Sequence, residues 1–248
     1  MDLGISDKRA IVAAGTAGLG LATAVSLARN GAKVVICGRD EQRLQHAIDA
    51  VGHGCVGIQH DVATHATAMQ FVTKAIDALG GVDILVTNGG GPQPGSALDT
   101  PIDKYPAALE LSLLSVIGMC QVALPNMRAQ KWGRIIAITS VSVKQPIATL
   151  ALSNTARAGV TGYLKSLARD VASEGVTVNS VQPGIHLTDR IKVVSGDTLS
   201  AQALGIPAGF IGDPADFGEI CAFFASEQAK YITGAHLNVD GGQYAGLQ

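Results

Sequence analysis

Short apolar runs alternate along the chain with longer segments in which apolar residues recur every three or four positions. The short runs predict strands and the longer segments predict helices. We expect strands near residues 8–14, 33–37, 55–59, 82–87, 134–139, 176–181 and 236–240. Helical patterns lie between them, the first ending at residue 30 and the others covering 41–51, 64–80, 106–130, 153–174 and 214–226. Such alternation is typical of a parallel sheet covered on both faces. The pattern predicts a doubly wound α/β domain with a seven-stranded parallel sheet.

The composition fits one domain and argues against one class of partner. The chain has 248 residues, 47% of them hydrophobic, and no repeat or linker divides residues 1–248. A net charge of −2 offers no broad basic surface, so nucleic acid is not an expected partner. Residues 186–212 carry turn formers without a regular period. A loop of this length in a compact domain is usually a lid or a binding loop.

The cysteines and the N-terminus indicate a compartment. The four cysteines have no CxxC spacing and two fall in predicted strands, so we expect buried free thiols in a reducing environment. The N-terminal stretch MDLGISDKRA is charged where a signal peptide needs an apolar run. No apolar stretch reaches the ~18 residues that suggest a membrane span. We therefore expect a cytoplasmic protein with no membrane partner.

A glycine-rich turn follows the first predicted strand. It reads Gly15-Thr16-Ala17-Gly18-Leu19-Gly20 and leads into the first helix. Glycines here let the backbone approach a diphosphate, while the helix N-terminus supplies N–H donors and partial positive charge. A tight turn without a ligand uses the same residues, so the surrounding β-turn-α-β unit is what favours a nucleotide site.

Arg39 distinguishes between two nucleotides. It stands just past the second predicted strand, where a fold of this type contacts the adenosine ribose. An acidic residue would bond the 2′-hydroxyl of NAD, whereas arginine suits a 2′-phosphate. Cys37 stands about where the NAD-type aspartate usually appears. NADP(H) is therefore favoured over NAD(H). The alternative is a solvated arginine in the charged run GRDEQR.

Polar and glycine residues also follow the later strands. These residues are Asp61 and Val62, Asn88 and Gly90, Ser140, and Pro183, Gly184 and Thr188. In this order and spacing they resemble the short-chain dehydrogenase/reductase family, over nearly the whole chain. The resemblance implies a Rossmann-type domain, with the Asp-Val pair beside the adenine and the threonine near the nicotinamide amide or the phosphates.

The glycine turn departs from the family form TGxxxGxG. Gly18 and Gly20 match, but Ala13 and Ala14 occupy the Thr-Gly positions and Gly15 sits one place late. Alanine at position 14 is compatible with a normal turn, although its methyl group lies near the expected phosphates.

The residues that the family uses for chemistry are mostly different here. In the family a tyrosine gives the proton, a lysine lowers its pKa and holds the ribose, a serine polarises the substrate, and an asparagine supports a water relay. Ser140 matches the serine, while Ser153, Arg157 and Ser112 stand at the tyrosine, lysine and asparagine positions. A serine hydroxyl is a much weaker acid than a phenol. Arginine can anchor ribose hydroxyls but cannot surrender a proton.

Ser153 and Arg157 lie four residues apart and share one helix face. This spacing fits a cofactor-facing pair, and it equally fits a helix N-cap followed by an exposed arginine. Tyr163 lies six residues further on and is expected to be structural. Three groups are candidates for the missing acid: Ser142, Lys144 and His186. A lone histidine also commonly packs or bonds locally.

Three functions remain open. The first is an NADP(H)-dependent reductase or dehydrogenase of a small carbonyl or alcohol, with altered proton delivery, and we favour it. The second is a lyase resembling the halohydrin dehalogenases, which carry arginine at the lysine position and bind no nucleotide. Those enzymes keep the tyrosine and lose the glycine turn, whereas this chain does the opposite. The third is a non-catalytic nucleotide-binding or scaffold protein. The C-terminal YITGAHLNVDGGQY resembles the family segment that packs against a partner subunit, so a homotetramer or homodimer is expected.

Overall fold

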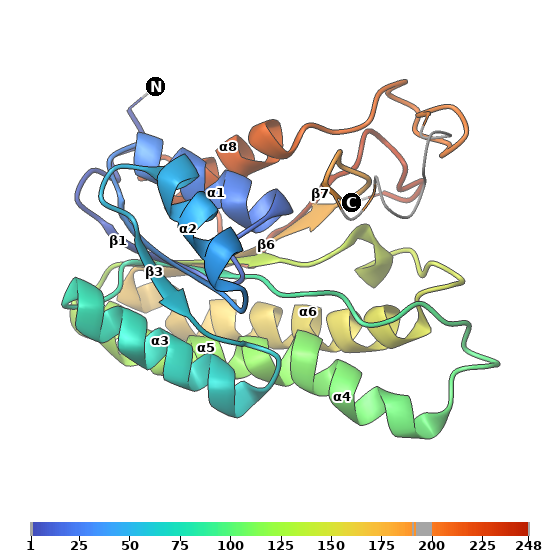
Figure 1. The fold of residues 1–248 in the computed structure, drawn as a ribbon, viewed down its shortest axis with the longest axis horizontal. Coiled ribbons are helices and arrows are strands. Elements are labelled where there is room, and N and C mark those ends of the chain that lie inside the picture. The colour runs from blue at the N-terminus through green and yellow to red at the C-terminus, as the bar shows by residue number, and fades with distance from the viewer. Residues whose placement is uncertain (1, 190, 192–199, 248) are drawn as a thin grey trace.

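Seven parallel strands form one sheet in the middle of the molecule (Figure 1). The computed structural model describes residues 2–189, 191 and 200–247. The strands are β1 (Arg9–Val12), β2 (Lys33–Gly38), β3 (Val56–Gln59), β4 (Ile84–Thr87), β5 (Gly133–Ile138), β6 (Val176–Pro183) and β7 (His236–Val239). Their order is β3-β2-β1-β4-β5-β6-β7, and every neighbouring pair is parallel. The predicted fold class is confirmed. Each strand overlaps the apolar run that predicted it.

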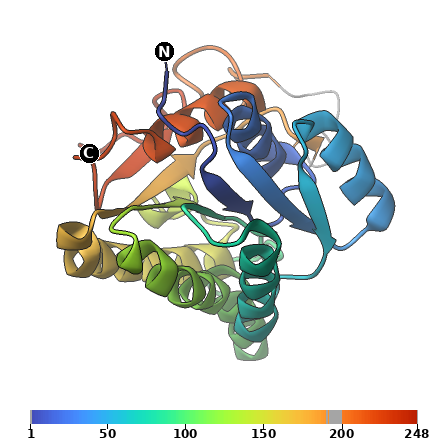
Figure 2. The same cartoon turned by 90° about the vertical axis from the view of Figure 1, so that its left-hand side faces the viewer.

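Helices cover both faces of the sheet (Figures 1 and 2). One face carries α1 (Gly18–Arg29), α2 (Glu41–Val51) and α8 (Pro214–Ala225). The other face carries α3 (His65–Leu79), α5 (Ser115–Ala129) and α6 (Ala151–Val171). Successive residues of a strand point to opposite faces, so Val12 joins the core beneath α1 and α8 while Ile11 joins the core beneath α3, α5 and α6. The apolar strands therefore serve two cores at once.

The predicted helix at 106–130 covers most of a helical run that begins four residues earlier and changes its type along its length. The run opens with a 3-10 turn (Ile102–Lys104), continues as α4 (Tyr105–Leu109), widens into a π-helical turn (Glu110–Leu114) and then becomes α5. By length and composition alone, Ile102–Ala129 is a helix that could cross a membrane. Its residues Met119, Cys120 and Met127 are buried in the core beneath the sheet. One side of α5 therefore packs into the core beneath the sheet.

Helix α6 begins two residues earlier than the sequence pattern predicts. Its N-cap position is Leu150, which makes no side-chain capping bond, and its first residue is Ala151. Ser153 is therefore inside the first turn and buried, so the interpretation of Ser153 as a helix N-cap is wrong. Arg157 is half-buried, and its Nη1 donates to Ile138 O at 3.2 Å, which also excludes the exposed arginine of that interpretation.

The turn between β1 and α1 is held by a side chain from the next strand in the sheet. Asn88 follows β4, and its Nδ2 donates to Ala13 O at 3.3 Å and to Ala14 O at 3.1 Å. Ala14 has φ +48°, in the left-handed region that favours glycine. The expectation of a normal turn at Ala14 is therefore wrong, because this alanine keeps the backbone shape that a glycine would adopt without strain.

Candidate functional site

A cleft of about 640 Å³ opens at the carboxyl ends of the central strands. It lies where the strand order reverses between β1 and β4, which is where open α/β sheets bind ligands. Most of the predicted nucleotide contacts line it. They are Thr16, Gly18, Leu19, Gly20, Arg39, Asp61, Val62, Asn88, Gly90, Arg157, Pro183 and Thr188. Segments that follow five strands thus meet helix α6 in one cavity.

Two predicted nucleotide contacts do not line the cleft. A Cβ on Gly15 would lie 2.8 Å from Ile36 Cγ2, and the N–H of Gly15 donates to Cys37 O at 3.0 Å. A Cβ on Gly184 would lie 2.7 Å from Asp240, and its N–H donates to Val239 O at 2.9 Å. Both glycines allow close packing of neighbouring segments.

At the other two glycines of the turn, a side chain would crowd the residues that surround the cleft. A Cβ on Gly20 would lie 2.5 Å from Asn88 Nδ2, and one on Gly18 would lie 3.3 Å from Thr188 Cγ2. Gly90 has no heavy atom within 4 Å of that position, so its backbone faces open space. A cradle of exposed backbone at the start of a helix fits a diphosphate. The residues present are therefore compatible with a dinucleotide.

The end of the cleft near Arg39 carries more basic side chains than the sequence analysis identified. Arg43 lies in the first turn of α2 and lines the cleft together with Arg39. Its backbone N–H is held by the N-cap carboxylate of Asp40 at 2.8 Å. His60 also lines the cleft, with its Nε2 2.9 Å from Thr67 O. The four-residue spacing of the two arginines was the signal available in the sequence.

Cys37 lies at the same end of the cleft, and its thiol is unreactive. Its Sγ accepts a hydrogen bond from the N–H of Ala14 at 3.3 Å. Burial raises the pKa of the Cys37 thiol to about 12. The thiol is therefore protonated at neutral pH and unsuited to nucleophilic chemistry.

Of the serines expected near the reacting atoms, Ser140 and Ser142 follow β5 in one short turn, Ser112 lies in the π-helical turn and Ser153 lies in α6. Ser140 Oγ accepts a hydrogen bond from Ser142 N at 3.1 Å. The hydroxyls of Ser112 and Ser142 are buried and have no hydrogen-bond partner among the described residues. Ser112 lies in the π-helical turn, and π-turns are frequent at functional sites. Neither Ser140 nor Ser153 is among the residues that line the nucleotide cleft.

The side chains of Lys144 and His186 make their contacts elsewhere, although Lys144 ends the same short turn that Ser140 begins. Lys144 Nζ donates to His236 O at 2.9 Å and lies 5.6 Å from the centre of the Tyr244 ring. His186 packs edge-on against Phe217, with ring centroids 5.0 Å apart, and lines a separate pocket of about 200 Å³. Burial lowers the pKa of His186 from its usual value, although the carbonyl of Gly184 opposes this shift. The ring is therefore neutral at pH 7.

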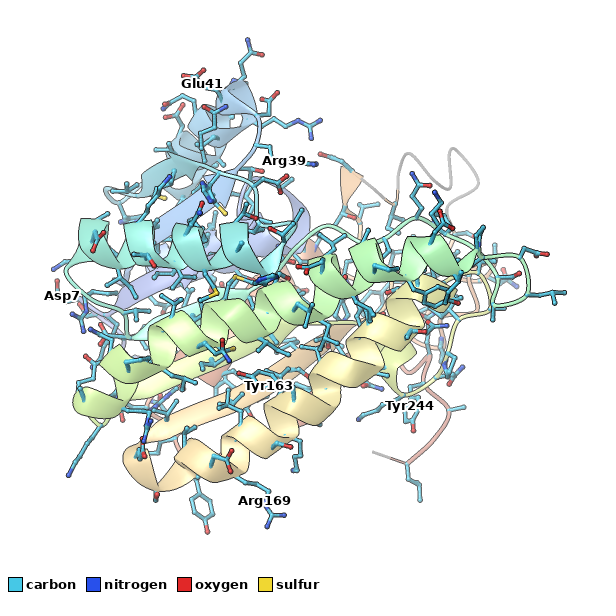
Figure 3. All side chains as sticks on the ribbon, turned by 90° about the horizontal axis from the view of Figure 1, so that it is seen from below. Asp7, Arg39, Glu41, Tyr163, Arg169 and Tyr244 are labelled. Carbon is cyan, nitrogen blue, oxygen red and sulfur yellow. The ribbon has the colours of Figure 1, made fainter. Side chains whose placement is uncertain are left out.

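Tyr163 faces the interior between α5 and α6 (Figure 3). Burial is the main cause that raises the pKa of this phenol, and the neighbouring Cys120 adds to it. Its position one face away from the cleft agrees with the structural role expected for it.

Comparison with known proteins identifies the family. A family model described as enoyl-(acyl carrier protein) reductase matches residues 13–243. The chain is 37% identical over 243 residues to the 3-oxoacyl-[acyl-carrier-protein] reductase FabG of Vibrio cholerae, covering 98% of this chain and 99% of that protein. The chain belongs to the short-chain dehydrogenase/reductase family of oxidoreductases.

Two solved structures resemble the fold closely. L-sorbose reductase from Gluconobacter frateurii, complexed with NADPH and L-sorbose, has a TM-score of 0.90 and 28% identity, with 100% of each chain covered. A short-chain oxidoreductase from Pseudomonas aeruginosa PAO1, described as containing an atypical catalytic center, also has a TM-score of 0.90 and 28% identity, covering 98% of this chain and 100% of that chain. The family match includes both the glycine turn and the serine cluster.

Proposed function

We propose that this family member is an NADP(H)-dependent oxidoreductase of a small carbonyl or alcohol, with a proton delivered by a group other than a phenol. One observation carries the proposal. The part of the glycine turn from Thr16 to Gly20, two arginines, the Asp61-Val62 pair, Asn88 and Thr188 all line a single cleft at the point where the strand order reverses. The relative crystallised with NADPH supports the same cofactor.

The residues of the cleft suggest a division of roles. The turn from Gly18 to Gly20 and the N-terminus of α1 would hold the diphosphate. Arg39 and Arg43 would bond the 2′-phosphate, because guanidinium groups match phosphate oxygens in pairs. Arg157, one helical turn from Ser153, would anchor ribose hydroxyls. The bound nicotinamide supplies or receives the hydride.

At the reacting oxygen, Ser140 is the side chain that we expect to polarise the substrate. No tyrosine or lysine is among the described residues lining the cleft. Ser153, Ser112, Lys144 and His186 remain candidates for assisting proton delivery. Of these, Lys144 and His186 would have to leave their present contacts to reach the cleft.

The same lack of a phenol favours a second candidate, a non-catalytic nucleotide-binding or scaffold protein. A family member that binds NADPH and turns over no carbonyl would have this function. The lyase hypothesis has less support, because the cleft retains the glycine turn that nucleotide-independent enzymes of this type do without.

The test is a titration of the purified protein with NADPH and NADH by fluorescence. We expect NADPH to bind roughly ten- to a hundred-fold more tightly, as a charge-assisted contact of about 1.5–3 kcal/mol implies. Arg39→Ala should remove most of that difference. Arg169→Ala is the matched control, because Arg169 is an exposed arginine on the far side of the molecule (Figure 3). Equal affinities in the parent protein would mean that Arg39 is only solvated.

A panel of ketones and aldehydes then separates the two candidates. An oxidoreductase should oxidise NADPH in the presence of at least one carbonyl, with activated carbonyls the best substrates. Nucleotide binding without turnover across the panel would favour the scaffold function. Absence of nucleotide binding would reject both.

A further inference from the structure

A second cavity, with a volume of about 450 Å³, adjoins the nucleotide cleft. The glycines at 89–91 line the cleft, and the next four residues, 92–95, line the second cavity. Leu111 lines both. The cleft and the second cavity are therefore neighbours along one segment of the chain. We call the second cavity the proline chamber, because its wall includes three prolines, Pro92, Pro94 and Pro101.

The helices contribute an apolar wall to the proline chamber. Helix α4 supplies Ala107 and Ala108, the π-helical turn supplies Leu111, and α6 supplies Leu152. Ala108 is 4% exposed and Leu152 is 6% exposed, so these two side chains form the inner end of the chamber. Cavities with such walls bind apolar groups, because binding removes apolar surface from water.

The polar side chains of the same wall are either bonded within the loop or exposed. Asp99 Oδ2 accepts a hydrogen bond from Ser96 Oγ at 2.5 Å, and Thr100 Oγ1 donates to Ser96 O at 2.5 Å. Gln93 and Lys104 are exposed and stand at the rim. An apolar group in the chamber therefore leaves these polar groups paired or hydrated, which avoids the cost of burying them alone.

The loop that forms the chamber is fixed to the start of α6. The N–H of Gly95 donates to Thr149 O at 2.7 Å, and Gly95 O accepts from the N–H of Ala151 at 3.0 Å. Ala151 is the first residue of α6, where an N–H needs a partner outside the helix. The chamber is thus held beside Ser153, which follows Leu152 in the first turn of that helix.

We propose that the proline chamber binds an apolar group attached to the reacting carbonyl carbon. The inference rests on the proposed reductase function and narrows its substrates to ketones or aldehydes that carry such a group. With the carbonyl in the cleft, the apolar group would pass Leu111, which the two cavities share, and lie between residues 92–95 and Leu152. Ala107, Ala108 and Leu152 are then specificity-determining residues, because their size limits what the chamber holds.

The test measures kcat/KM with NADPH for a homologous series of vicinal diketones, from butanedione to heptanedione. These compounds are activated carbonyls whose chains carry no charge. Each methylene that enters an apolar site should raise kcat/KM about two- to fourfold, so heptanedione should exceed butanedione about tenfold or more. Reduction of every diketone with no dependence on chain length would overturn the inference and leave the proposed function intact.

Ala107→Phe fills the chamber from an exposed position of α4. It should reduce the preference for heptanedione about tenfold, while kcat/KM for butanedione and the Kd for NADPH stay within about twofold. The matched control is Ala78→Phe, at an exposed alanine of α3 outside the chamber, which should change none of these quantities. An unchanged preference in Ala107→Phe would overturn the inference. If that variant altered only the sedimentation of the protein, the chamber would be a contact between copies of the chain, which also overturns it.

A crystal structure with NADP⁺ and heptanedione provides a readout that does not depend on turnover or on the variant. The alkyl chain is expected between residues 92–95 and Leu152. A chain that lies outside the chamber would overturn the inference even if the enzyme reduces heptanedione. A chain inside the chamber of a protein that reduces none of the diketones would instead reject the proposed function, and with it the role of the chamber in substrate selection.

Discussion

At the scale of single residues, Ala14 holds a conformation that its side chain disfavours. A Cβ at the left-handed φ of this residue costs about 1–2 kcal/mol of conformational energy. A glycine would remove this strain, but its greater freedom in the unfolded chain would offset part of the gain in stability. Ala14→Gly should therefore raise the free energy of unfolding by up to about 1 kcal/mol, measured in urea. The control is Ala13→Gly, at a buried position without positive φ, which should lower stability. A destabilised Ala14→Gly variant would show that the packing of the methyl group stabilises the fold by more than the backbone strain costs.

Single residues also show what the sequence can and cannot predict. Arg39 and Asp61 were identified because a strand end fixes where the next residue emerges. Arg43 was missed, because its approach to the cleft depends on how α2 is placed over the sheet. His60 was also missed, although it directly follows β3 and the same strand-end rule applies to it. Lys144 was grouped with the serines by its place in the chain, yet its long side chain reaches across to β7. Sequence proximity is a weak guide to contacts made by long side chains.

At the scale of elements, an ion pair joins β1 to the segment before β4. Asp83 accepts hydrogen bonds from the backbone and guanidinium of Arg9 at 2.7 to 2.9 Å, and from Gln130 Nε2 at 2.9 Å. Burial of Asp83 opposes its ionisation, but the bonds from Arg9 outweigh that effect and hold the pKa of Asp83 below its usual value. The amino ends of the strands and the end of α5 are thus locked together.

The sign of the resulting pH dependence follows from the lowered pKa. Stability from Asp83 is present above its unfolded pKa of about 3.9 and is lost as the pH falls through the lower folded value. Asp83→Asn should cost about 2–3 kcal/mol of unfolding free energy at pH 7, and the difference from the parent should shrink towards pH 2. Urea unfolding at pH 7 and at pH 2 measures the difference in unfolding free energy between the variant and the parent. Asp103→Asn is the control, because that carboxylate is exposed and pairs with the neighbouring Lys104. A pH-independent difference would contradict the assignment.

The helical run before β5 shows why element boundaries were harder to predict than elements. Apolar periodicity detects α5 well, but the π-helical turn at Glu110–Leu114 adds a residue and shifts the phase of the pattern. A single period therefore cannot describe the whole run. Ser112, inside this turn, points to a different side than a uniform α-helix would give it.

At the scale of the whole molecule, the order of strands and helices followed directly from the sequence pattern. Strands buried on both faces have no polar face to confuse the assignment, and βαβ connections leave few ways to order parallel strands. The shape of the outer surface does not follow from such patterns. The groove between α8 and β7 is lined by apolar side chains that include Phe223 and Leu237, both partly exposed.

Because this groove is apolar and exposed, we expect a second copy of the chain to cover it in a homotetramer or homodimer. Sedimentation of the purified protein should give two or four chains at micromolar concentration. Leu237→Lys should shift it towards the monomer, because a charge at the centre of an apolar contact is costly to bury. The control is Leu98→Lys, at a highly exposed leucine outside the groove. A monomer at all concentrations would contradict the expectation.

The amide of Asn88 that spans the glycine turn has a consequence for the speed of ligand capture. Two carbonyl oxygens of the turn are already held before any nucleotide arrives, and Gly20 packs so closely on this amide that the helix start has little freedom. A nucleotide that binds as proposed would meet a preorganised turn, so no loop would have to become ordered during binding. The association rate constant would then be similar for different nucleotides, as for the docking of rigid partners. Differences in affinity among nucleotides would come from their dissociation rate constants.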